Sequence, residues 1–81
     1  MLRDDIGSVA NALRDLGAAE TSAAATARAT AAALTTLAVG SNRPELPKAG
    51  KAAAAAFDTH RRTGDLLVGT ADLLHWFAAR V

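Results

Sequence analysis

Among the side chains that could bind a metal ion, the sequence has two histidines, His60 and His75. No cysteine is present, so a thiolate site is excluded. On one helix the two imidazoles would be about 22 Å apart, because each residue adds about 1.5 Å along the axis. The pair therefore cannot bind one ion without a partner chain. We expect no metal site and no cofactor, and we expect His60 to pack inside the fold.

Two further patterns are typical of catalysis but lack essential groups. The run Gly64–Thr70 has glycines at the spacing of a phosphate-binding loop, yet the lysine is missing and the run lies within a helical pattern. Asp58, Asp65 and Asp72 recur every seven residues, which separates neighbours by about 10.5 Å on a helix. No second catalytic group accompanies them. We therefore expect a protein without enzymatic activity.

Composition makes a self-sufficient core difficult to build. Apolar residues are 51% of the 81, but 22 of them are alanine. A chain of this length buries only about 60% of the surface that its unfolded form exposes. We therefore expect a partner chain.

The charge balance gives little reason to expect nucleic acid as that partner. The net charge is +1, and no aromatic residue lies among the basic residues Arg43, Lys48 and Lys51. The most apolar stretch, residues 23–39, contains Arg28 and is shorter than the roughly 18 uncharged apolar residues of a spanning helix. We expect neither nucleic-acid binding nor membrane insertion.

Glycine and proline divide the chain into two nearly equal halves. Gly40 is suited to end a helix, and Pro47 is suited to the first turn of the next one. Neither half contains an internal proline. The sequence predicts one all-α domain of residues 1–81, with a helix over 3–39, a turn over 40–46 and a helix over 47–80.

Apolar residues recur in both halves at alternating steps of four and three, which is typical of helices in a coiled coil. In the first half the positions are Leu2, Ile6, Val9, Leu13, Leu16, Glu20, Ala23, Ala27, Thr30, Leu34 and Leu37. In the second half they are Ala53, Phe57, His60, Gly64, Leu67, Ala71, Leu74, Ala78 and Val81. Paired as an antiparallel hairpin, opposing residues have numbers that add to 87. The fold point then lies between Arg43 and Pro44, and large residues face small ones.

The pattern predicts which residues hold the hairpin together. The expected hairpin core is Leu13, Leu16, Leu34, Phe57, His60, Leu67 and Leu74. Glu20 interrupts this apolar series. Its side chain either leans out into water or meets a basic group on another chain, and we assign it to a partner interface.

A second apolar stripe lies beside the first on the second helix. Leu66, Leu73 and Phe77 form it, and Trp76 borders it. One interpretation is that a wide apolar face simply covers the other helix. The other is a docking surface for a second hairpin, which would complete a four-helix bundle. On the first helix a row of small residues is the expected companion surface: Ala10, Gly17, Ala24, Ala31 and Ala38.

Two short motifs on this architecture resemble a known superfamily. The segments Ala54–His60 and Leu74–Phe77 are similar to the Ala-Ala-X-Phe-X-X-His and later Ile-His-X-X-Phe patterns of PE proteins. PE, EspC-type and Trp-X-Gly proteins are small substrates of type VII (ESX) secretion systems. The turn of this chain has no Trp-X-Gly. The whole chain has no tyrosine. The Tyr-X-X-X-Asp/Glu export signal that the resemblance implies would therefore come from a partner or from a tail beyond Val81.

The resemblance implies a helical hairpin that pairs with another hairpin, identical or different, and is secreted after folding in the cytoplasm. The function expected is protein–protein interaction. The alternative is a helical docking or leader module of a larger toxin or of a cytoplasmic complex. A membrane-surface helix is disfavoured, because the polar faces mix both signs of charge.

Overall fold

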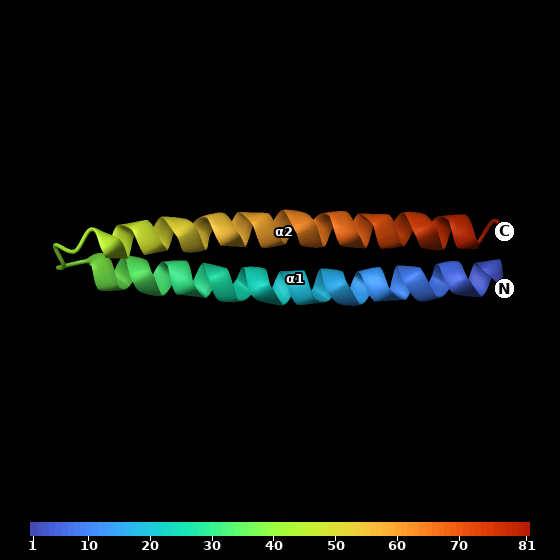
Figure 1. Cartoon of the computed structure of the whole chain (residues 1–81), viewed down its shortest axis with the longest axis horizontal. Coiled ribbons are helices and arrows are strands. Elements are labelled where there is room, and N and C mark those ends of the chain that lie inside the picture. Colours follow the sequence, from blue (N-terminus) through green and yellow to red (C-terminus); the bar gives the residue numbers. More distant parts are fainter.

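A computed structural model describes all residues 1–81 and consists of two long helices joined by one tight turn. Helix α1 spans Leu2–Ala38 and helix α2 spans Glu45–Ala78. The two run antiparallel along their whole length as a straight rod, whose Cα atoms extend 61 × 12 × 12 Å (Figure 1). The predicted all-α hairpin is confirmed.

Local sequence explains why both halves are helical. Alanine has the highest helix propensity, and it dominates the middle of α1 and the start of α2. Threonine is a weaker helix former, but its hydroxyl can donate to the carbonyl four residues earlier. Five threonines make this bond, at 2.8–3.1 Å: Thr21, Thr30, Thr35, Thr36 and Thr70. Their hydroxyls are thereby satisfied without interrupting the helix.

The turn lies one to two residues earlier than predicted. Val39 ends α1 in an extended conformation, and Gly40 follows with φ +78°, a left-handed value that glycine adopts without steric cost. Helix α2 begins at Glu45, so Pro47 is its third residue and not its first. A proline is tolerated there because the first N–H groups of a helix have no acceptor within it.

Small residues form the contact between the helices. The residues with the least exposure are all alanine or glycine, at intervals of seven in each helix: Ala10, Gly17, Ala24, Gly64, Ala71 and Ala78. Ala10 and Ala71 are fully buried, whereas no large side chain is. Because the contact residues are small, the two backbones lie close together.

The approach is tight where Gly17 meets Gly64. A Cβ atom on Gly17 would lie 2.8 Å from Cγ2 of Val68, which is shorter than a van der Waals contact. A Cβ atom on Gly64 would lie 3.4 Å from both the Gly17 carbonyl oxygen and Cβ of Glu20. The backbone of each helix therefore forms part of the surface that the other helix packs against.

The register differs from the predicted one by about one helical turn. Residues that face each other across the contact have numbers that add to 84, not 87. The pairs are Gly17 and Leu67, Gly64 and Glu20, and Gly50 and Leu34. The fold point is accordingly at Asn42. The prediction aligned the two apolar series at the turn, but in the structure Gly17 and Gly64 lie about one turn apart near mid-rod, where each contacts the backbone of the other.

Half of the predicted contact of α1 is also displaced by one residue. Leu13 and Leu34 face α2 as expected. Glu20 was assigned to a partner interface but also faces α2, and the second contributing row is the one from Ala10 to Ala38, which was predicted to face outward. Leu16 was predicted to be in the core and is 55% exposed. That prediction is wrong because the contact is made by the small residues from Ala10 to Ala38, and a leucine in their place would hold the helices apart. The contact of α2 lies where it was predicted, from Ala53 to Ala78.

Replacing Gly17 by leucine is expected to lower the free energy of unfolding by about 1–3 kcal/mol, because the side chain overpacks the closest part of the contact. Thermal or urea unfolding followed by circular dichroism at fixed protein concentration measures the change. Gly69 provides the matched control, since nothing lies within 4 Å of a Cβ atom placed there. Gly69→Leu should leave stability unchanged or raise it by up to about 1 kcal/mol through helix propensity. Equal effects at the two positions would contradict a close approach at Gly17.

Candidate interaction surface

Charged side chains gather on one long side of the hairpin. Arg14 of α1 forms an ion pair with Asp72 of α2 across this side, and Arg61 lies 3.7 Å from Asp58. The guanidinium of Arg28 lies 5.9 Å from the centroid of the Phe57 ring. We call this side the polar flank.

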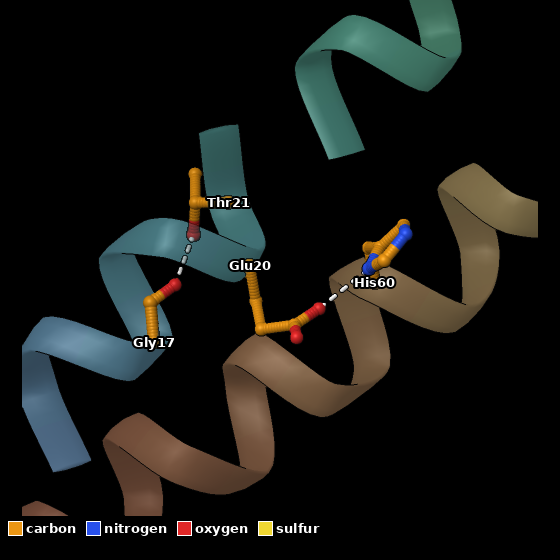
Figure 2. Close-up of polar contacts among 4 residues, drawn as sticks. All are labelled: Gly17, Glu20, Thr21 and His60. Atoms are coloured by element: carbon orange, nitrogen blue, oxygen red, sulfur yellow. Dashed lines mark hydrogen bonds and ion pairs between the residues drawn. The ribbon is translucent and has the colours of Figure 1, made fainter. Parts of the chain in front are cut away.

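A second polar contact joins the helices near mid-rod. Glu20 Oε2 and His60 Nδ1 are 2.6 Å apart, and Figure 2 shows the Glu20 side chain reaching from α1 to the imidazole on α2. In the same view Thr21 Oγ1 donates to the Gly17 carbonyl at 3.0 Å. Glu20 therefore meets a basic group of its own chain. His60 packs in the contact, as its place in the pattern suggested.

A shallow groove of about 540 Å³ opens on the polar flank. Alanines of α1 form its floor, Phe57 closes one side, and Arg28, Arg61 and Asp65 lie at its edges. The groove exists because the alanine-rich part of α1 lacks side chains long enough to fill the space beside α2. The groove therefore combines an alanine lining with charged side chains at its edges.

The opposite side of the hairpin carries no charge between its ends. Its residues flank the contact on the side away from the polar flank, at steps of three and four along each helix. On α1 they are Val9, Ala12, Leu16, Ala19, Ala23, Thr26, Thr30, Ala33 and Leu37. On α2 they are Ala49, Ala52, Ala56, Thr59, Thr63, Leu66, Thr70, Leu73 and Phe77. We call these eighteen residues the uncharged face.

The large side chains of the uncharged face are open to solvent. Leu66 is 72% exposed, Leu73 65% and Phe77 46%, and Val9 and Leu16 on α1 are each more than half exposed. Single exposed apolar residues are ordinary on protein surfaces, but a continuous patch of them typically marks an interaction site. This face is the candidate site.

Trp76 lies at the edge of the uncharged face. The guanidinium of Arg80 is 3.6 Å from the centroid of its ring, and Arg80 also donates to the Trp76 carbonyl at 3.0 Å. An arginine stacked on an indole keeps a charged group in water while covering apolar surface. Trp76 is thus placed at a polar rim.

The sequence-predicted residues fall into two groups in the structure. Those predicted for the partner interface on α2 are exposed together: Leu66, Leu73, Trp76 and Phe77. Six of those predicted for the hairpin core lie half-buried between the helices: Leu13, Leu34, Phe57, His60, Leu67 and Leu74. Leu16 is the exception and is exposed. Glu20 lies with this second group.

Sequence reasoning chose the wrong row of α1 for the exposed face. Val9 and Leu16 were placed inside the hairpin, but they lie on the same side as Leu73 and Phe77. The available signal was the charge pattern. The row containing Val9 and Leu16 contains no charged residue, and neither does the equivalent row of α2.

The groups that resembled chemical sites are kept apart by the fold. No three of the histidine and acidic side chains lie close enough together to hold a metal ion. The run Gly64–Thr70 is continuous α-helix within α2, so its amides are engaged in helical hydrogen bonds.

Comparison with protein-family models, with curated proteins and with solved structures gives no match for this chain. Neither helix has the length of apolar sequence that crossing a bilayer requires. A functional interpretation therefore depends on the geometry of the hairpin itself.

The contact between Glu20 and His60 is expected to contribute more to stability than the exposed pair of Asp58 and Arg61. A double-mutant cycle with alanine at Glu20 and His60 should give a coupling energy of about 1 kcal/mol, because this hydrogen bond is partly shielded from water. The same cycle at Asp58 and Arg61, within one helix, should give about 0.3 kcal/mol. Chemical unfolding of the four variants in each cycle measures both. A coupling near zero at Glu20 and His60 would contradict the contact.

Proposed function

We propose that this protein is a non-enzymatic interaction module that pairs with another helical hairpin through the uncharged face. The observation that carries the proposal is the exposure of leucine and phenylalanine side chains along a face without charges, while the contact inside the hairpin uses alanine and glycine. Burying apolar surface stabilises an assembly by about 25 cal/mol per Å². A second pair of helices laid on this face completes a four-helix bundle.

The distribution of side chains supports pairing by helices over binding of a small molecule. The uncharged face is straight and follows both helices for most of the rod. Ligand sites are concave and enclose most of their ligand, with convergent polar groups. Helices that lie along one another need a long apolar surface, and charged residues are depleted at the centre of such interfaces.

We further propose that the chain belongs to the type VII secretion substrates that it resembles, and that it is exported as a folded pair. The support is the architecture of 37- and 34-residue helices around a short turn, together with the PE-like residues. Phe57 and His60 of that motif lie in the contact between the helices.

Export predicts that the chain appears in the culture medium of its host and stays in the cells when the ATPase of the type VII system is deleted. Immunoblotting of both fractions tests this, with a cytoplasmic marker as the control for lysis. Equal amounts in the medium with and without the ATPase would contradict export by this route, but not the pairing of hairpins.

Replacing Leu73 and Phe77 together by aspartate is expected to abolish pairing while the helices persist. Two carboxylates on the uncharged face would have to lose water in the complex, and the cost exceeds the gain from the remaining apolar contacts. Sedimentation velocity measures the mass of the assembly, and circular dichroism measures helicity.

The matched control adds two aspartates to the other side of the hairpin. Ala18→Asp with Ala25→Asp places the same charge at exposed positions of α1 outside the uncharged face. This variant should pair as the unmodified chain does. The assignment fails if the Leu73 and Phe77 variant keeps its assembled mass, or if both variants lose it equally.

A further inference from the structure

Two hollows follow one another along the polar flank. The first is the groove of about 540 Å³ beside Phe57, and the second holds about 310 Å³ near the turn. Thr35 and Lys51 line the second hollow, and they lie seven residues from Arg28 and Asp58. Because seven residues are close to two helical turns, these side chains share one side of the hairpin. The two hollows therefore form one shallow groove along the half of the flank that is nearest the turn.

Small residues line this groove. Five alanines line it on α1: Ala24, Ala25, Ala29, Ala32 and Ala38. Gly50 and Ala54 continue the small lining on α2. From Thr21 to Ala38 the lining of α1 extends about 25 Å along the helix axis. Small residues leave room for large ones opposite them, so the groove fits a straight segment that presents large apolar side chains.

Positive charge predominates at the edges of the groove. Three cationic side chains line it: Arg28, Arg61 and Lys51. Asp65 is the one carboxylate among the lining residues. Arg61 lies 3.7 Å from Asp58, but Arg28 and Lys51 form no ion pair. The charges of Arg28 and Lys51 are therefore free to meet carboxylates of a partner.

We infer that this groove binds an acidic amphipathic helix of another protein. The large apolar side chains of that helix lie on the alanines, and its aspartates or glutamates meet Arg28 and Lys51. A helix of about 17 residues has the length of the groove. The groove lies outside the uncharged face, so this inference goes beyond the proposed pairing of hairpins and does not depend on it.

The shape of the groove favours a helix over a small molecule. Small-molecule sites are concave and enclose most of their ligand, whereas this groove is shallow and straight. Amphipathic helices bind by laying a stripe of apolar side chains into such a groove. Complementary charge at the rim adds selectivity, because it attracts an acidic segment and disfavours a basic one.

Two labelled peptides of about 17 residues test the inference. The first is a designed amphipathic peptide with leucine at steps of three and four and glutamate beside the leucines. The second has lysine in place of each glutamate. Fluorescence anisotropy should show that the full chain binds the acidic peptide about tenfold more tightly than the basic one. Raising the ionic strength from about 0.1 M to about 1 M shortens the screening length from about 10 Å to about 3 Å, so this preference should shrink severalfold.

A reversal of charge locates the peptide on the chain. Arg28→Glu with Lys51→Glu should weaken binding of the acidic peptide about tenfold and should make the basic peptide the preferred one. Damage to the fold would not exchange the preference in this way. Arg62→Glu with Lys48→Glu is the matched control, because it makes the same change of charge at exposed positions of α2 that do not line the groove. Circular dichroism checks that each variant stays helical.

A change of size tests the floor of the groove. Ala29→Leu should weaken binding of the acidic peptide about tenfold, because the leucine occupies the space that the apolar side chains of the peptide would fill. Ala18→Leu is the control, since Ala18 is exposed on α1 and does not line the groove.

Several results would overturn the acidic helix as the occupant. Equal binding of the two peptides does so, and so does equal weakening by a groove variant and its control. A single-stranded DNA oligonucleotide with the same charge as the acidic peptide should bind more weakly than the peptide. Equal binding of the oligonucleotide would overturn the inference, because the groove would then attract any polyanion.

The variant with aspartate at Leu73 and Phe77 separates this inference from the proposed function. It should bind the acidic peptide as the unmodified chain does. Loss of the peptide together with loss of pairing would place the peptide on the uncharged face, which overturns this inference and keeps the proposed function. Pairing that is indifferent to these aspartates, with the peptide still bound at Arg28 and Lys51, overturns the proposed function and keeps this inference.

Discussion

Close approach of two helix backbones at Gly17 and Gly64 is the constraint on which the rest of the structure depends. Each glycine gives the opposing helix room where a side chain would collide, and alanines at intervals of seven continue the narrow contact in both directions. Packing of this kind gains many small dispersion contacts over a long length. It also fixes the register, because only one alignment puts glycine beside glycine.

A contact made of small residues has a consequence for where the large ones lie. Alanine side chains bury little apolar area, so the hairpin gains less from burial than a leucine-rich coiled coil of the same length would. The leucines beside the contact are kept outside, because the helices are too close to admit them. The close spacing of the two helices therefore accounts for both the thin core and the exposed apolar face.

The sequence predicted the helices, the turn and the contact of α2 because each depends on local signals. Gly40 and the two prolines locate the turn, and the series from Ala53 to Ala78 runs unbroken along α2 beside the stripe of Leu66, Leu73 and Phe77. On α1 two neighbouring rows competed. The row with Val9 and Leu16 is more hydrophobic, but the row with Ala10 and Gly17 permits closer packing, and hydrophobicity alone ranks them in the wrong order.

The exposed leucines of α2 were found from the sequence for a related reason. They lie beside a contact row that was already complete, so they had no place inside the hairpin. The contribution of α1 to that face could not be found in this way, because its leucines were first needed to fill the predicted contact. The contact between Glu20 and His60 depends on the register, and the predicted register, which differs by about one turn, places those residues apart.

The hairpin also determines how anything joined to it would be arranged. Both chain ends leave the rod together and the turn lies at the far end (Figure 1). Segments fused before Met1 and after Val81 would begin at the same end of the rod, and the turn would be free at the other end.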